Sequence, residues 1–382
     1  MKNLLKWLKS VRFPYKPLIS IYIDKDRLLT NLESYMAIAP QGHIAPVLKS
    51  NAYGHGLIEV AQILENYRSK HPNLTEEIPF FCIDSYFEAI SLKSKGIETP
   101  LLIIGFTRPE DIISSKLKNI SFVITSLEQL QSISSCHHPI NIHLKIDTGM
   151  NRQGLKQDQI NQAIKIIKEN RNLKLEGLIS HFADADNTDQ NFTDRQISIW
   201  NKVVENLQKY FSIKYIHISN TSGHKYTQTI NANLSRLGIG LYGFDKNVES
   251  VKPVLSMKTI ITSVKNIDKG ESVGYNGTFT ASRDMKIATI PVGYYEALDR
   301  SLSNKGFVKI GDHFCPIIGR ISMNISTIDV SEIMDVKIGD DVIVISNNLA
   351  DKNSITNISK LTQTIEYENL VHIPQHLKRV IV

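Results

Sequence analysis

The sequence is dominated by a regular alternation of short apolar runs and helical patterns between residue 19 and about residue 240. The runs that predict strands lie at residues 19–23, 44–48, 79–83, 101–104, 121–124, 140–146, 175–181 and 215–219. Segments between them, such as 158–169 and 195–210, repeat apolar residues at helical spacing. Strands that alternate with helices over this length predict a parallel sheet, closed as an eight-fold barrel of the (β/α)8 TIM type.

The pattern changes after about residue 250, where glycine-punctuated runs replace the alternation. Strands are predicted at 254–266, 286–291, 307–310, 314–318, 327–330 and 342–345, and only residues 354–361 have helical spacing. This pattern of short strand-like runs separated by glycines predicts a β-rich C-terminal domain. The chain is therefore divided into an N-terminal amphipathic extension (1–16), a barrel domain (17–250) and a β-rich domain (251–382).

The N-terminal extension carries Leu4, Leu5 and Leu8 on one helical face and lysines elsewhere. The lysines interrupt the continuous apolar centre that a signal peptide needs, and no apolar run in the chain reaches membrane-spanning length. The extension is predicted to dock as a helix on the protein's own surface. The alternative is an amphipathic helix that lies on a membrane surface.

Composition narrows the class of function. A hydrophobic content of 42% and a charged content of 21% are ordinary for a soluble globular protein, and a net charge of +6 is modest for 382 residues. No basic cluster is interleaved with aromatic residues, so no nucleic-acid partner is predicted. The cysteines, Cys82, Cys136 and Cys315, are odd in number and widely spaced, which predicts no metal site and a reducing compartment, the cytoplasm.

The stretch from Ile44 to Gly56 carries the most chemical information. A predicted buried strand delivers Lys49, and a glycine-rich turn containing Tyr53 follows before helical spacing begins at Leu57. Desolvation at such a position lowers the pKa of a lysine, and a neutral amine can attack an aldehyde. The Tyr53 hydroxyl lies in the turn, within reach of a phosphate. The alternative is a lysine whose ammonium group extends into water.

This segment resembles the pyridoxal-phosphate lysine segment of the alanine racemases. Further matching segments run in the same order from about residue 17 to the C-terminus, so the resemblance covers nearly the whole chain. It implies a fold type III enzyme that carries pyridoxal 5'-phosphate on Lys49. It also implies a cytoplasmic homodimer that interconverts L-alanine and D-alanine by a two-base mechanism and supplies D-alanine for peptidoglycan.

The resemblance assigns roles to residues at the ends of later barrel strands. Arg152 matches an arginine that reaches the cofactor's phenolic oxygen and the substrate carboxylate, and Lys145 matches a lysine that is carbamylated in many members. Without the resemblance, Arg152 would be interpreted as part of a surface ion pair. His181 matches a histidine beside the pyridine ring, although a lone histidine at a strand end is more often structural.

Other residues are placed around the cofactor by the same resemblance. They are Tyr53, Asn220, Thr221, Arg236, Gly238, Ile239 and Tyr367. Thr221 stands where the family usually has a phosphate-binding serine, and it keeps the hydroxyl. Arg236 matches an arginine that faces the pyridine nitrogen. Because arginine stays protonated, it donates a hydrogen bond and cannot accept the ring proton, which weakens the cofactor as an electron sink and suits racemisation.

Three residues of the β-rich domain complete the expected site. Tyr275 matches the second acid/base group, on the opposite face of the substrate Cα from Lys49. Tyr294 matches a tyrosine that lines the substrate approach, and Met323 a residue whose backbone N–H binds the substrate carboxylate. In this family Tyr275 and Met323 come from the partner subunit, so the resemblance implies a head-to-tail homodimer with shared active sites.

The chain also departs from the family pattern. Tyr294-Tyr295-Glu296-Ala297 replaces the usual Tyr-Ala-Asp-Gly, Asn324 stands where an aspartate is usual, and the C-terminal end is short. The charge lost at position 324 predicts activity on alanine or serine and poor activity on lysine and arginine.

Alternative functions stay open at this point. The chain could be a racemase of another amino acid, with serine or broad specificity. A decarboxylase of the same architecture is disfavoured by Arg236 and Tyr275. A pyridoxal-phosphate-binding protein without turnover has no need of Tyr275 and Met323.

Overall fold

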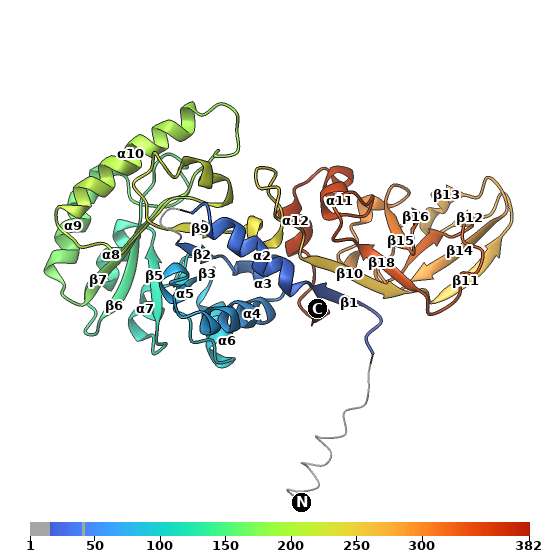
Figure 1. Ribbon diagram of the computed structural model, residues 1–382, viewed down its shortest axis with the longest axis horizontal. Helices are drawn as coiled ribbons and strands as arrows, with labels where there is room; N and C mark the ends of the chain where they lie inside the picture. The colour runs from blue at the N-terminus through green and yellow to red at the C-terminus, as the bar shows by residue number, and fades with distance from the viewer. Residues whose placement is uncertain (1–15, 40–42) are drawn as a thin grey trace, which may run out of the picture. The chain divides into compact units, whose positions relative to one another are not determined.

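The computed structural model describes residues 16–39 and 43–382 (Figure 1). The predicted amphipathic helix of the N-terminal extension lies outside the described residues. The described chain forms two compact units: Asp24–Val254, and the residues up to Ile23 joined to Leu255–Val382. Within the described ranges, no helix is both long and apolar enough to cross a membrane.

The described part of the first unit contains eight parallel strands. They are β2 (Ile44–Pro46), β3 (Phe81–Ile83), β4 (Leu101–Ile103), β5 (Ile120–Ile124), β6 (Ile140–Lys145), β7 (Leu173–Ile179), β8 (Tyr215–His217) and β9 (Ser235–Leu237). Strands β3 to β8 pair in sequence order, and β2 pairs with β9. A Val47–Cys82 bridge joins β2 to β3, and the Arg236 N–H donates to the Ser219 carbonyl (3.1 Å) to join β9 to the end of β8. The predicted barrel is confirmed.

One predicted barrel strand is wrong. Residues 19–23 contain a strand, β1 (Ser20–Ile23), but it pairs with β10 (Leu255–Ile260) and β19 (Lys378–Ile381) of the other unit's sheet. Alternate residues of β1 are buried, as in a strand with one covered face, whereas β3 and β4 are buried throughout. The barrel strand that the sequence analysis missed is β9, because its three residues, Ser-Arg-Leu, contain no apolar run.

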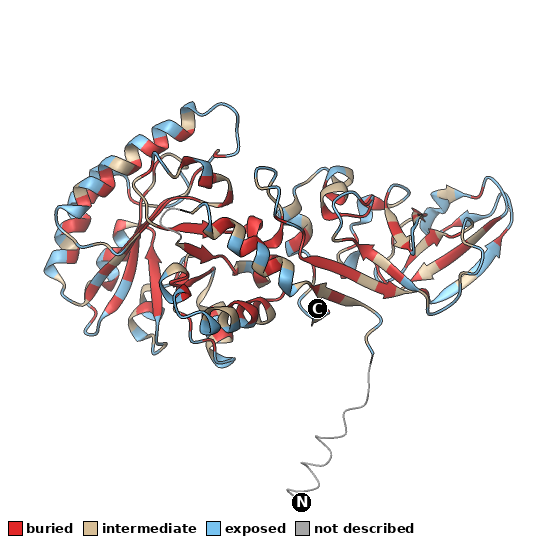
Figure 2. Cartoon of the chain, in the orientation of Figure 1, coloured by how far each residue is buried: buried red, intermediate tan, exposed pale blue. Residues whose placement is uncertain are grey.

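In the described part of this unit, α2 precedes the first barrel strand, and the other helices lie between the strands in sequence. The helices are α2 (Lys25–Met36), α3 (Lys49–Tyr53), α4 (Leu57–Lys70), α5 (Leu74–Glu77), α6 (Tyr86–Ser94), α7 (Pro109–Ser114), α8 (Leu127–Ile133), α9 (Ile160–Glu169) and α10 (Asn191–Gln208). Serine caps fix two of their starts: Ser85 accepts from the Glu88 N–H, and Ser126 from the Gln129 N–H, both at 3.2 Å. Figure 2 shows buried residues along the strands, and both buried and exposed residues along α9 and α10, as expected of amphipathic helices.

The second unit is built on a nine-stranded sheet with the order β11-β14-β17-β16-β15-β18-β10-β1-β19 within its described residues. Its other strands are β11 (Ser263–Ile267), β14 (Met285–Ile290), β15 (Phe307–Ile310), β16 (His313–Ile318), β17 (Ser326–Asp329) and β18 (Asp341–Ile345), with a small pair β12 (Ser272–Val273) and β13 (Phe279–Thr280). The β-rich prediction is confirmed. Two helices, α11 (Ile355–Thr362) and α12 (Glu366–Val371), lie where the sequence predicted only the first.

Candidate active site

The segment that carries Lys49 turns in an uncommon way. Lys49 is half-buried and begins α3 directly after the buried Leu48. The next four residues, Ser50 to Tyr53, have φ values of 56°, 57°, 51° and 52°, all in the left-handed region. Because a left-handed conformation costs an L-residue about 1–2 kcal/mol, surrounding contacts have to hold this turn. The sequence analysis predicted a glycine-rich turn and missed the left-handed conformation of these non-glycine residues.

Two side chains hold the strained turn from either end. The Glu88 carboxylate of α6 accepts from the Ser50 N–H at 2.8 Å, and the Asn51 side-chain oxygen accepts from the Leu57 N–H at 2.9 Å, at the start of α4. The turn leaves Tyr53 buried, with 7% of its surface exposed. Lys49 and Tyr53 are therefore held by the same rigid segment.

The hydroxyl groups of Tyr53 and Thr221 lie close to the backbone of Gly238, just after β9, and the three residues form a small cradle. A Cβ atom added at Gly238 would lie 2.9 Å from the Tyr53 hydroxyl and 3.8 Å from Thr221 Oγ1. Thr221 begins the short 3-10 helix η3 (Thr221–Tyr226), and its Oγ1 accepts from the Gly240 N–H at 3.2 Å. Ile239 begins the next turn, η4 (Ile239–Tyr242). Two hydroxyl groups therefore converge on a backbone without a side chain, which is the donor set that a phosphate requires.

Asn220 has a local role beside this cradle. Its side-chain oxygen caps η3 by accepting from the Gly223 N–H at 3.0 Å. The cap fixes the start of η3, where Thr221 lies. Asn220 thus positions a cradle residue, in addition to the cofactor contact that the resemblance implies.

Arg236 lies in the barrel core with 4% of its surface exposed. Its guanidinium donates to the carbonyl groups of Ser180 (2.7 Å), His217 (2.9 Å) and Ile218 (3.1 Å). It also contacts Nδ1 of His217 at 2.7 Å and Nδ1 of His181 at 3.2 Å. Since a guanidinium only donates, both Nδ1 atoms must accept, which assigns the tautomer of each ring. Burial lowers the pKa of Arg236 to about 10, so the side chain stays cationic at neutral pH.

A buried polar chain extends from His217 away from Arg236. With Nδ1 accepting, His217 donates through Nε2 to Nδ1 of His143 at 2.8 Å. Nε2 of His143 then faces the Glu176 carboxylate at 3.5 Å. The sequence analysis singled out neither His143 nor Glu176, because each lies inside a predicted strand and gives no motif.

The carboxyl ends of the strands collect positive charge. Burial, together with the nearby Arg236, Arg152 and Lys49, lowers the pKa of Lys145 to about 8. Burial and the same cations lower the pKa of His181 to about 3, so this ring is neutral at physiological pH. Arg152 is exposed on the loop after β6. The site is therefore suited to anionic groups.

The other four predicted site residues belong to the second unit, and all are exposed. The exposed fraction is 68% for Tyr275, 44% for Tyr294, 56% for Met323 and 40% for Tyr367. Tyr275 begins a 3-10 turn, η5 (Tyr275–Gly277), and Tyr294 begins another, η6 (Tyr294–Glu296). Large side chains at this exposure are not buried by their own unit.

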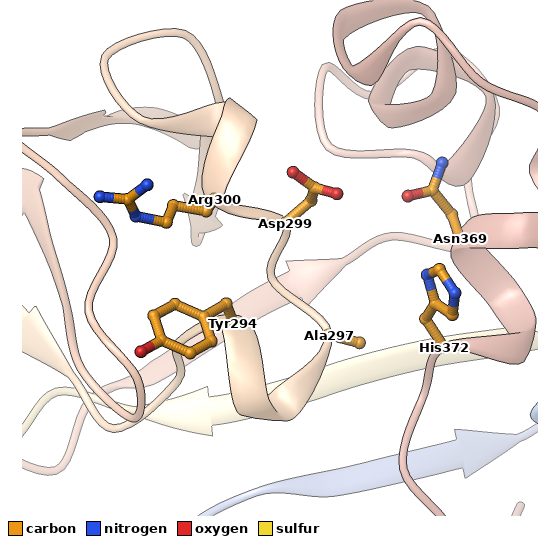
Figure 3. Close-up of a pocket in the computed structure, with 6 residues that line it drawn as sticks. All are labelled: Tyr294, Ala297, Asp299, Arg300, Asn369 and His372. Carbon is orange, nitrogen blue, oxygen red and sulfur yellow. The ribbon is translucent and has the colours of Figure 1, made fainter.

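A pocket of the second unit opens beside Tyr294 (Figure 3). It is lined by Tyr294, Ala297, Asp299, Arg300, Asn369 and His372. Asn369 lies in α12, the helix that also carries Tyr367, and His372 is the C-cap of that helix. Tyr294 and α12 are thus near each other in one unit.

His224, three residues after Thr221 on η3, is a buried titratable group of the barrel unit. Its ring is 7% exposed and packs against Tyr35, with the ring centroids 4.8 Å apart. Among the described residues, neither ring nitrogen has a hydrogen-bond partner. Burial lowers the pKa of His224 to about 4, although the Asp245 carboxylate opposes this shift.

The free energy of unfolding should therefore fall in acid. An unfolded histidine titrates near pH 6.5, so between pH 6.5 and 4 the unfolded chain binds the extra proton, and stability is lost as pH falls through this range. Between pH 7.5 and 5 this group accounts for roughly 2 kcal/mol. Urea unfolding of His224→Phe should show a pH profile flatter than wild type by that amount. The exposed His313→Phe is the matched control, and an unchanged His224→Phe profile would contradict the assignment.

Comparisons with known proteins identify the family of the chain. The alanine racemase N-terminal domain family matches residues 23–246, and the C-terminal domain family matches residues 254–381. The alanine racemase of Fusobacterium nucleatum is 35% identical over 370 residues, which cover 95% of this chain and 99% of that protein. A solved structure of the Clostridium difficile 630 alanine racemase has a TM-score of 0.87 at 28% identity, covering 96% of each chain.

A second activity occurs among the structural neighbours. A histidine racemase from Leuconostoc mesenteroides has a TM-score of 0.84 at 25% identity, covering 97% of this chain and 99% of that one. Both domain families and the full-length relatives nevertheless agree on one assignment. The chain belongs to the alanine racemase family.

Proposed function

We propose that the protein is a pyridoxal-phosphate-dependent alanine racemase. The observation that carries this proposal is the position of Lys49 on the same rigid turn as Tyr53, whose hydroxyl meets Gly238 and Thr221. An amine and an anion cradle fixed by one segment suit a cofactor that has an aldehyde and a phosphate. When bound, the cofactor supplies a sink for the electrons left at Cα after proton removal.

The residues of the barrel unit fit the remaining parts of the cofactor. Arg236 would donate to the pyridine nitrogen, and its bonds to three carbonyl groups hold it in place. The neutral His181 would stand beside the ring, and Arg152 would bind the phenolic oxygen and the substrate carboxylate. The pKa of Lys145, lowered to about 8, gives this side chain a larger neutral fraction than an ordinary lysine, so it would be open to carbamylation, and the resulting anion would orient Arg152.

Two bases serve the two enantiomers. Lys49 takes the Cα proton of D-alanine, and Tyr275 takes that of L-alanine from the opposite face. Tyr275 and Met323 are supplied by the partner subunit of a head-to-tail homodimer, and their exposure of 68% and 56% on their own unit supports this. The Met323 N–H would bind the substrate carboxylate, Tyr294 would line the approach, and Tyr367 would contact the phosphate. The protein acts in the cytoplasm and supplies D-alanine for peptidoglycan.

The decisive experiment is incubation of the purified protein with L-alanine in deuterated water. Racemisation should yield D-alanine that carries deuterium at Cα. A yellow protein that gives neither D-alanine nor deuterium exchange would instead be a binding protein without turnover. Carbon dioxide release without inversion would indicate a decarboxylase.

The second candidate is a racemase of another amino acid, which the histidine racemase neighbour favours. The structure argues for a small neutral substrate. The Glu296 carboxylate is 5% exposed and already accepts from the Gly293 N–H (2.9 Å) and the Asn324 amide (2.6 Å), so it is not available to a substrate cation.

Turnover should therefore be highest with alanine or serine and at least about tenfold lower with lysine, arginine and histidine, a penalty typical of one missing polar contact. The measurement is kcat/KM for each amino acid with the same enzyme preparation. A preference for lysine, arginine or histidine would overturn the assignment to alanine while leaving the racemase chemistry intact.

A further inference from the structure

Two positions at which this chain departs from the family pattern are in contact. Glu296 ends η6, and its carboxylate accepts from the Gly293 N–H at 2.9 Å through Oε2. Its other oxygen, Oε1, accepts from the Asn324 amide at 2.6 Å. The glutamate is 5% exposed, so these two donors replace much of the water that it would otherwise bind.

The Glu296–Asn324 hydrogen bond joins the Tyr294 turn (η6) to the Met323 turn (residues 322–325). The backbones of these two turns are already in contact. The Tyr294 N–H donates to the Ser322 carbonyl at 3.1 Å, and the Tyr295 N–H to the Met323 carbonyl at 3.0 Å. A Cβ atom at Gly293 would lie 2.2 Å from the Ser322 oxygen, so the two backbones touch without room for a side chain. The Glu296–Asn324 bond is the third connection between the turns, and the only one of the three made by side chains.

The identities of the two residues are complementary. The amide of Asn324 supplies the N–H that the buried carboxylate needs, and an aspartate there could not donate unless it were protonated. Aspartate at 324 would place two carboxylates within hydrogen-bond distance, and such a pair ionises fully only at a large cost. In this chain the asparagine therefore satisfies one oxygen of the buried glutamate. This differs from the sequence-based prediction that Asn324 acts on the substrate through its charge.

We propose that Glu296 and Asn324 form a positioning pair that holds the Tyr294 turn against the Met323 turn, and so sets the substrate-binding geometry of the second unit. The inference rests on the proposed function, because Tyr294 and Met323 are its substrate-side residues. Neither Glu296 nor Asn324 touches the substrate. Their effect reaches the reaction through the position of the Met323 N–H.

The test compares Asn324→Asp, Glu296→Gln and the double variant as holoenzymes, with kcat and KM for alanine measured between pH 6.5 and 9.5. Asn324→Asp should raise KM about tenfold at high pH, where both carboxylates are ionised and repel. Near pH 6.5 a shared proton restores the bond, so KM should approach the wild-type value. The double variant again pairs an amide with a carboxylate and should return KM to within about threefold of wild type across the range.

Asn266→Asp is the matched control, since it makes the same charge change on the exposed strand β11. It should keep the wild-type KM at every pH. A merely structural role of the pair would lower stability without a pH-dependent KM. The proposal is overturned if Asn324→Asp matches the control, or if the double variant is no better than Asn324→Asp.

Thermal unfolding of the wild type, the two single variants and the double variant measures the Glu296–Asn324 pair without reference to activity. The double variant should be more stable than the sum of the single changes predicts. If the effects of the two single substitutions on stability simply add in the double variant, the two side chains do not interact and the proposal fails. Coupled stabilities in a protein that never racemises alanine would uphold the contact and reject the proposed function, so the two failures are distinguishable.

Discussion

The Lys49→Met variant is expected to lose alanine racemisation by a factor of about ten thousand or more. Lys49 serves both as the covalent anchor of the cofactor and as one of the two bases, and general-base catalysis alone contributes about 100- to 10,000-fold. Methionine keeps much of the side-chain volume, so the left-handed turn from Ser50 to Tyr53 should persist. The measurement is the rate of D-alanine formation from L-alanine with cofactor in excess.

Borohydride reduction of the wild-type protein locates the attachment independently. Peptide mapping should place the reduced cofactor on Lys49, and the purified protein should be yellow before reduction. Lys165→Met, on the exposed side of α9, is the control and should keep both colour and activity. If the reduced cofactor is found on another lysine, Lys49 is not the residue that binds the cofactor covalently.

The Tyr275→Phe variant is expected to bind the cofactor normally and to lose racemisation in both directions by about a hundredfold or more. Tyr275 is 68% exposed on its own unit, so loss of its hydroxyl should leave the fold intact. Both directions must fall together, because each enantiomer uses one base to lose its proton and the other to regain it.

Solvent exchange separates the two bases. With Lys49 intact, D-alanine should still exchange its Cα proton with deuterated water without inversion in the Tyr275→Phe enzyme. L-alanine should exchange slowly. Tyr210→Phe, an exposed tyrosine of the barrel unit, is the control. Near-normal turnover of Tyr275→Phe would mean that the second base lies elsewhere.

The sequence predicted the parts of the fold that depend on apolar patterning. The mostly buried barrel strands, β3 to β7, lie within about two residues of the predicted runs. The errors occur where the sheet to which a strand belongs is determined by its pairing with distant segments, and not by the local apolar pattern. Strand β1 was assigned to the barrel because it precedes a helix, yet its register with β10 and β19 depends on segments more than 200 residues away. Strand β9 was missed because its central residue is the buried Arg236.

The candidate site could be predicted residue by residue only through the family resemblance. Lys49, Tyr53 and Thr221 lie in segments that match family motifs. The His143–Glu176 contact and the Glu296–Asn324 hydrogen bond are visible only in the structure. Both are side-chain contacts between segments distant in sequence, and no local pattern reports such contacts. The sequence showed that positions 296 and 324 depart from the family pattern, but it did not show that the two side chains are hydrogen-bonded to each other.

The pairing of β1 with both β10 and β19 has a consequence for synthesis of the chain. Because domains generally fold as units during translation, residues 24–254 are expected to fold once they emerge, whereas β1 has no partner until Leu255–Ile260 is made. Even then one edge of β1 stays open until Lys378–Ile381 is made. An unpaired strand edge is a template for other chains. Ribosomal stalling within the last few residues should therefore yield aggregates seeded at Ser20–Ile23, although the barrel in the same nascent chain is already complete.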